Sequence, residues 1–229
     1  MRIEIRNVTK SYASVTALCN ISVTIESGSR VALIGPNGSG KSTLIHALMG
    51  MVRTQGTIRL DGRDPLRDRN MIAPRLAYVP QVLPQFSFTV GEMIQAIRLI
   101  RDLPQGKIEE YAGCLRLDVA PISAKPVKDL SGGMKQKLSL ALALACDVGL
   151  LVLDEPTASL DRESRQRFYE ILGERSCNRT LVLSSHRLEE VGQLVNQVVV
   201  LNGGQLEYQG IVETFLAAGF PKEQKHDAA

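Results

Sequence analysis

Tryptophan is absent from this chain of 229 residues, and histidine, cysteine and aromatic residues are all scarce. The four cysteines stand far apart and none forms a C-x-x-C pair, so the sequence indicates neither a zinc site nor a disulfide framework. Isolated cysteines of this kind are typical of a reducing cytosol, where they pack as small apolar residues.

Long apolar runs and blocks of like charge are also missing. The longest apolar stretch, residues 138–153, is interrupted by Asp147 and is too short to span a bilayer. The first six residues alternate like a strand and lack the apolar region of a signal peptide. A net charge of +3 is too small to indicate nucleic acid as a partner. If this protein serves a membrane, we expect it to do so from the cytosolic side, through a partner.

The length suits one α/β domain with a small subdomain. Alternating residues in segments 3–5 and 21–25 predict antiparallel strands, whereas short apolar runs predict strands buried on both faces. Further strands are expected at residues 30–34, 56–60, 75–79, 150–153, 180–184 and 198–201. Residues 205–208 are expected to form a short edge strand.

In the middle third of the chain, apolar residues recur at helical spacing instead of forming strand patterns. Helices are expected at residues 41–50, 90–101, 107–117, 131–145, 162–172 and 188–195. We therefore expect one domain over residues 1–220, with a sheet core from 1–89 and 146–220 and a helical subdomain inserted at 90–145. Residues 221–229 are polar and are expected to form a flexible tail.

A glycine-rich loop follows the expected strand at residues 30–34. It matches G-x-x-x-x-G-K-[ST] and consists of Gly35, Pro36, Asn37, Gly38, Ser39, Gly40, Lys41 and Ser42. The glycines let backbone N–H groups approach phosphates, Lys41 reaches the β- and γ-phosphates, and Ser42 offers its hydroxyl to Mg²⁺. A glycine turn without a ligand is the plain alternative. The strand before the loop and the apolar helix after it favour an ATP site in a P-loop NTPase sheet domain.

Two acids, Asp154 and Glu155, follow the apolar strand at residues 150–153. Ligands of open parallel sheets bind at this edge of the sheet. Asp154 is expected to hold Mg²⁺ through water, and Glu155 to accept a proton from the attacking water. Alone the two residues would be ordinary solvated acids, but beside a phosphate loop they indicate a hydrolytic site.

A second glycine motif, Ser131-Gly132-Gly133, begins the expected helix at residues 131–145. Its plain role is to cap that helix. It also presents bare N–H groups at a helix N-terminus, which forms a second anion site that a single nucleotide does not require.

The three motifs, in this order, resemble the ABC (ATP-binding cassette) ATPase family. The resemblance implies a head-to-tail dimer, with a homodimer expected, in which Ser131, Gly132 and Gly133 of one chain bind the γ-phosphate of the ATP held by the other. It also implies a multi-span membrane permease as partner and a cytoplasmic location, peripheral on the inner face of the cell membrane.

Single positions follow from the same resemblance. Tyr12 matches the aromatic residue that stacks on adenine, with a role as a core aromatic as the alternative, and Thr43 matches the contact to the α-phosphate. Gln81 matches the sensor of Mg²⁺ and γ-phosphate, and His186 the switch histidine. Asp161 matches the loop that crosses the dimer seam, or it simply begins a helix. The resemblance thus assigns catalysis to Lys41, Gln81, Glu155 and His186, and magnesium to Ser42, Gln81 and Asp154.

The chain departs from the family pattern at Met134, where glutamine is most common. Met134 and the following Lys135-Gln136-Lys137 resemble stand-alone ATPases of export systems, and residues 123–129 lack the acidic-glycine motif of fused exporters. We therefore expect an exporter with a separate permease, docked near the apolar segment after Gln81 (Val82, Leu83, Phe86 and Phe88). A soluble ABC ATPase, such as an iron–sulfur assembly ATPase, is the alternative. The complete catalytic set argues against an inactive regulatory subunit.

Overall fold

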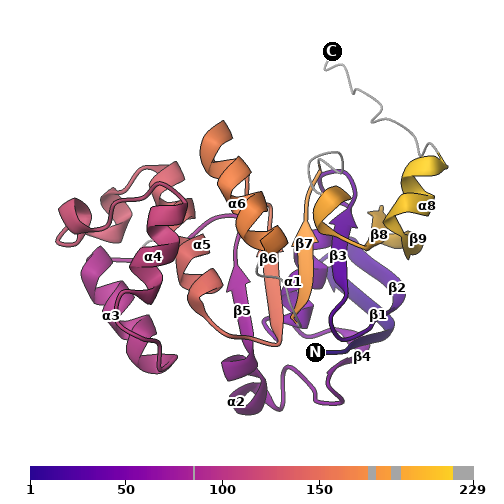
Figure 1. Cartoon of the computed structure of the whole chain (residues 1–229). Helices are drawn as coiled ribbons and strands as arrows, with labels where there is room; N and C mark the ends of the chain where they lie inside the picture. The colour runs from indigo at the N-terminus through magenta and orange to yellow at the C-terminus, as the bar shows by residue number, and fades with distance from the viewer. Residues whose placement is uncertain (85, 175–178, 187–191, 219–229) are drawn as a thin grey trace.

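The computed structural model describes residues 1–84, 86–174, 179–186 and 192–218 (Figure 1). A three-stranded antiparallel sheet has the order β2-β1-β4, and a six-stranded sheet has the order β5-β6-β7-β3-β8-β9. The strands are β1 (Ile3–Tyr12), β2 (Val15–Ile25), β3 (Arg30–Ile34), β4 (Gln55–Leu60), β5 (Leu76–Val79), β6 (Leu150–Asp154), β7 (Thr180–Ser184), β8 (Gln197–Asn202) and β9 (Gln205–Ile211).

The larger sheet is parallel from β5 to β8, and only β9 at its edge runs antiparallel. Its helices and the short 3₁₀ turns are α1 (Lys41–Leu48), α2 (Arg69–Ile72), η1 (Ala73–Arg75), α3 (Val90–Ile100), α4 (Lys107–Cys114), η2 (Ala120–Ile122), η3 (Val127–Asp129), α5 (Gly132–Ala145), α6 (Arg162–Glu174), η4 (Gly192–Leu194) and α8 (Val212–Ala217). The predicted α/β class, a P-loop sheet with an antiparallel subdomain, is confirmed.

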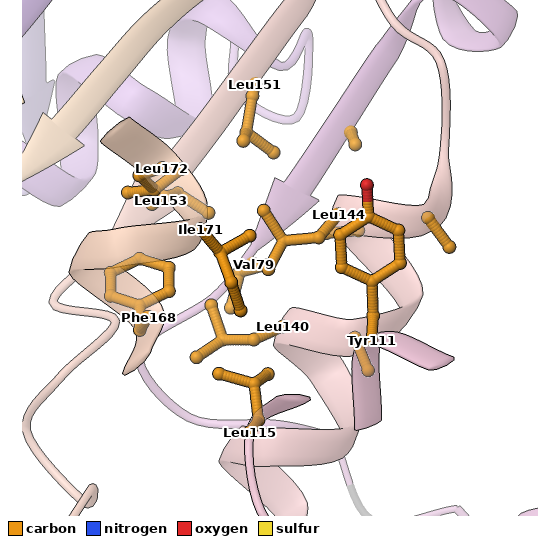
Figure 2. Packing of buried hydrophobic residues seen from close by; sticks show 14 of the residues in the cluster. Val79, Tyr111, Leu115, Leu140, Leu144, Leu151, Leu153, Phe168, Ile171 and Leu172 are labelled. Atoms are coloured by element: carbon orange, nitrogen blue, oxygen red, sulfur yellow. The ribbon is translucent and has the colours of Figure 1, made fainter. Parts of the chain in front are cut away.

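The two faces of the parallel sheet pack into two separate hydrophobic cores. Because strand side chains alternate, Leu150 and Val152 of β6 join a core shared with α1 and the antiparallel sheet. Leu151 and Leu153 belong to the core on the opposite face, which Figure 2 shows together with Phe168 and other buried residues of α5 and α6. A strand that is apolar on both faces is therefore explained by burial on both faces.

Helices α3, α4 and α5 lie together at the β5 end of the molecule (Figure 1). Helix α3 begins with a capping box, in which Thr89 Oγ1 accepts from the N–H of Glu92 and the Glu92 carboxylate accepts from the N–H of Thr89. At the other end of α3, Arg101 donates to the carbonyls of Ala73, Pro74 and Leu76. This arginine fastens the end of α3 to the start of β5.

Several predicted boundaries of strands and helices were wrong, by up to seven residues. The strand expected at 3–5 continues to Tyr12, and the strand expected at 21–25 begins already at Val15. The two strands pair as a hairpin whose turn is formed by residues 13 and 14. Arg75 belongs to a 3₁₀ turn rather than to the strand, and the helix expected at 107–117 ends at Cys114. The helix expected at 188–195 lies partly outside the described residues, as does the tail at 221–229. The helices in the described ranges are all too short to span a bilayer, since α5, with 14 residues, is the longest of them.

Candidate nucleotide site

The phosphate loop connects β3 to α1 and has the backbone that its glycines allow. Gly38 and Gly40 have φ angles of 80° and 102°, in the left-handed region. A Cβ at Gly40 would lie 2.4 Å from the carbonyl oxygen of Ala17, so this position also needs the absence of a side chain. The Ser39 hydroxyl is buried and has no hydrogen-bond partner among the described residues. A buried donor in a loop of this shape fits a phosphate oxygen.

Lys41 is buried, and its ammonium lies over its own loop. Its Nζ donates to the carbonyl of Gly35 at 2.6 Å and to that of Pro36 at 3.1 Å. Burial lowers the pKa of Lys41, and the nearby carboxylates of Glu155 and Asp154 oppose that shift. The loop therefore holds a cation at the position where phosphate charge would be neutralised.

The two acids at the end of β6 are fixed by Ser184 at the end of β7. Asp154 and Ser184 are partners in the parallel ladder. The hydroxyl of Ser184 donates to Asp154 Oδ1 at 2.5 Å and accepts from the N–H of Glu155 at 2.8 Å. Sequence reasoning missed Ser184, because a serine at a strand end gives no signal until the neighbouring strand is known.

Glu155 has a φ of 48°, which turns the chain sharply after β6. Its Oε2 lies 3.0 Å from Nδ1 of His186, which follows β7. The glutamate itself is buried, whereas the histidine side chain is about half exposed. The carboxylate is thus held between a buried backbone turn and an imidazole at the surface.

A pocket of about 350 Å³ joins the phosphate loop to the acid. It gathers most of the predicted phosphate-binding residues together with Gln81 and Glu155, and it adds Ala17, which the sequence did not indicate. The lining residues are Ala17, Asn37, Gly38, Ser39, Gly40, Lys41, Ser42, Thr43, Gln81 and Glu155. Asp154 and His186 adjoin the pocket through Ser184 and Glu155.

Tyr12 stands apart from this pocket. It ends β1, it is 45% exposed, and its ring centroid lies 4.7 Å from Lys10 Nζ. The alternative of a core aromatic is therefore wrong, because a buried position would leave the ring little exposed surface.

The residues predicted to bind magnesium offer oxygen ligands. Ser42 and Gln81 line the pocket, and Asp154 lies beside it. A hydroxyl, an amide oxygen and a carboxylate are ligands that Mg²⁺ takes together with substrate phosphates. The described residues contain no cluster of three or more His, Cys, Asp or Glu that could hold a metal alone. The donor set therefore fits magnesium held jointly by these residues and a nucleotide.

The second glycine motif is not part of the pocket in the same chain. Ser131 caps α5, its Oγ accepting from the N–H of Met134 at 3.3 Å, and Ser131 and Gly132 are exposed. None of Ser131, Gly132 and Gly133 is among the residues that line the pocket. A predicted ATP-binding motif thus points to solvent.

Comparison with known proteins agrees with this geometry. A family model described as ABC transporter matches residues 18–158, more than half of the chain. The high-affinity zinc uptake system ATP-binding protein ZnuC of Bacillus subtilis is 32% identical over 89% of this chain and 92% of its own length. The Nod factor export ATP-binding protein I of Sinorhizobium fredii is 36% identical over 91% of this chain and 62% of its own length.

Solved structures share the fold. An ATP-binding subunit of an ABC transporter superposes with a TM-score of 0.83 at 24% identity, covering 95% of this chain and 93% of that one. A bacterial Atm1-family ABC exporter with ATP bound superposes with a TM-score of 0.81 at 27% identity, covering 95% of this chain and 40% of that one. This chain belongs to the ABC transporter family, as an ATP-binding subunit that hydrolyses ATP.

Proposed function

We propose that two copies of this chain sandwich two ATP molecules and drive a membrane transporter whose permease is a separate protein. One observation supports the dimer. The pocket contains Lys41, Gln81 and Glu155, whereas the loop at Ser131 lies outside the pocket and is exposed. A helix N-terminus that presents serine and glycine N–H groups to solvent is suited to an anion from another molecule. A facing copy supplies that anion as the γ-phosphate of its ATP.

Within one chain, the proposed roles follow the geometry of the pocket. Lys41 and Thr43 bind phosphate oxygens, and Ser42, Gln81 and Asp154 hold Mg²⁺. Glu155 orients and deprotonates the attacking water, and His186 contacts the γ-phosphate while it keeps the carboxylate in place. Tyr12 lies at an exposed strand end where it can stack on adenine. Positioning and charge stabilisation account for most of the rate enhancement in such reactions.

The permease is proposed to dock in an apolar groove of about 220 Å³ beside β5, α3 and α5. Leu83 and Phe86, from the segment after Gln81, line this groove, and Phe86 stacks on Phe88 at a centroid distance of 4.9 Å. Val82 is largely exposed. The same segment therefore contacts the nucleotide pocket at Gln81 and the groove at Phe86, which supports a short permease helix as the occupant. In this proposal the protein lies in the cytoplasm, on the inner face of the membrane.

The proposed direction is export. It rests on Met134 and the following residues, whose pattern resembles export systems, while the relatives include both import and export proteins. Membrane vesicles carrying the protein and its permease test it: substrate accumulating on the side opposite the ATPase supports export. Co-purification with a soluble iron-carrying scaffold instead of a membrane protein would favour the alternative of an iron–sulfur assembly ATPase.

The dimer is tested with Glu155→Gln, which keeps the shape of the side chain and removes the base. With saturating ATP and Mg²⁺, we expect this variant to elute at twice the monomer mass in light-scattering chromatography and to hydrolyse no ATP. The matched control is Glu109→Gln on α4, which should behave as the wild type. Adding Ser131→Arg to Glu155→Gln should leave ATP binding intact and abolish the dimer, because Ser131 lies outside the pocket. A strictly monomeric Glu155→Gln protein would refute the proposal.

A further inference from the structure

The start of α5 is tied to the segment that follows Glu155. A Cβ on Gly133 would lie 3.1 Å from the carbonyl oxygen of Ser159, so helix and segment are in close contact there. Gln136 Nε2 donates to the carbonyl of Pro156 at 2.9 Å, and Lys137 Nζ lies 2.8 Å from Asp161 Oδ2. Positions 133, 136 and 137 share one face of a helix. One face of α5 therefore holds residues 156–161 along their length.

Gln136 is the most deeply buried of the α5 residues that make these contacts. It is only 4% exposed, within a helix whose other buried residues are mostly apolar. A buried amide is costly unless it is hydrogen-bonded, so a glutamine here needs its bond to Pro156. The carbonyl that it holds belongs to the residue directly after Glu155.

Glu155 depends on its neighbours for its orientation. Its backbone has a positive φ, its N–H is held by Ser184, and its carboxylate contacts His186. A non-glycine residue at positive φ persists only where the surroundings fix it. The bond from Gln136 fixes the peptide on the far side of the turn, which the other two contacts do not reach.

We propose that Gln136 is a positioning residue for Glu155, and that it links the hydrolytic carboxylate to the helix that begins at Ser131. This inference rests on the proposed dimer. There, the start of α5 contacts the ATP of the partner, while Glu155 acts on the ATP of its own chain. The amide of Gln136 therefore transmits the occupancy of one site to the geometry of the other, and the two sites hydrolyse ATP cooperatively.

Lys137 provides a matched control. It is the next residue of the same helix and it contacts the same segment, but its partner Asp161 is six residues beyond Glu155 and 56% exposed. This ion pair holds the end of a side chain rather than the peptide next to Glu155, and the Lys137 side chain itself is only 13% exposed. Lys137→Met should therefore change turnover by less than about twofold.

The decisive variant is Gln136→Met, which keeps the volume and removes the donor. We expect kcat to fall about tenfold, because the carboxylate loses its fixed position. The KM for ATP should stay within about twofold, since Gln136 does not line the pocket, and the Hill coefficient should fall towards 1. Equal kcat and Hill coefficient in Gln136→Met and wild type, or an equal loss in Lys137→Met, would overturn the proposal.

A second variant separates positioning from folding. In Gln136→Glu a protonated carboxyl can donate to the Pro156 carbonyl, whereas an ionised one repels it. The kcat of this variant, relative to wild type at the same pH, should rise as the pH falls. A merely structural role would lower Tm without this recovery, and that result counts against the inference even if Gln136→Met fails to fold.

A failure of the proposed dimer can be distinguished from a failure of the proposed role of Gln136. Glu155→Gln alone tests dimerisation, and Gln136→Met combined with Glu155→Gln should still dimerise with ATP and Mg²⁺. If Glu155→Gln stays monomeric, the proposed function fails. If it dimerises while Gln136→Met keeps full cooperativity, only the link through Gln136 fails.

Discussion

Nδ1 of His186 lies 3.0 Å from Oε2 of Glu155, although the two residues are 31 positions apart in the chain. Parallel pairing of β6 with β7 brings them together, because each residue follows the carboxyl end of its strand. The pair thus places an imidazole and the proposed base at the same edge of the sheet, within one hydrogen bond of each other.

Replacement of His186 by alanine tests this contact. We expect kcat to fall by about 10²-fold, since the carboxylate loses its orienting partner and the γ-phosphate a donor. Phosphate release measures kcat, and a fluorescent ATP analogue measures binding, which should weaken much less. The control is His46→Phe on α1, which keeps a ring against Tyr78. Full turnover in His186→Ala would remove the histidine from the site.

Lys41→Met should have opposite effects on binding and on stability. Loss of a charge-assisted contact should weaken ATP binding by about 10- to 100-fold. The protein without ATP should become more stable, because burial lowers the pKa of this ammonium below its ordinary value of 10.5 and so opposes folding with the charge present.

The pH dependence of this effect has a definite sign. Between the lowered pKa of Lys41 and 10.5, the unfolded chain binds more protons than the folded one, so the stability of the wild type rises with pH relative to Lys41→Met. Urea unfolding of both proteins at several pH values up to about 10.5 measures the difference. If the stability difference between Lys41→Met and the wild type increased as the pH rises, the lowered pKa of Lys41 would be contradicted.

Gly40→Ala should disrupt the phosphate loop. The new Cβ would meet the Ala17 carbonyl at 2.4 Å, and φ is 102°, so we expect a loss of about 3 kcal/mol in the free energy of unfolding and of most ATP binding. Gly28→Ala is the control, because it also has a positive φ but open space around it. It should cost about 1 kcal/mol and leave ATP binding unchanged. Equal effects of the two substitutions would show that the close approach is unimportant.

Asp161 should stabilise the protein in a pH-dependent way. The bond from Lys137, followed by bonds from the N–H and hydroxyl of Ser164, lowers the pKa of this carboxyl well below its ordinary value of 3.8. Its contribution is therefore complete above pH 3.8 and is lost as the pH falls from there towards the lowered pKa. The Tm difference between wild type and Asp161→Asn should shrink over this acid range. In a Lys137→Met background the Tm difference at neutral pH should be smaller but still present, because the two bonds from Ser164 remain.

The sequence alone brings the local parts of the candidate site together. The phosphate loop is continuous, and its glycine positions determine its backbone, so Asn37 to Thr43 came together as expected. Glu155 and Gln81 joined the same pocket because both follow strands whose apolar runs were recognisable. Asp161 also has the simple role that was considered for it, since its carboxylate accepts from the N–H of Ser164 at the start of α6.

Contacts between distant segments could not be predicted in this way. Ser184 holds both acids only because β7 is the neighbour of β6, and a single sequence does not give the order of strands. The bond from Gln136 to Pro156 depends on the packing of α5 against the sheet. The sequence alone does not decide between the two roles of Tyr12, because its alternating pattern does not show that the strand end projects beyond the core.

The alternation of β6 between two cores has a mechanical consequence for the acids that follow it. A lateral shift of this strand would disturb the packing on both faces at once, since Leu150 and Val152 belong to one core and Leu151 and Leu153 to the other. We expect the amide hydrogens of such a strand to be among the slowest to exchange with solvent. Asp154 and Glu155 are therefore anchored at the end of a strand that is packed on both faces, and we expect motion during the catalytic cycle to involve the elements around them.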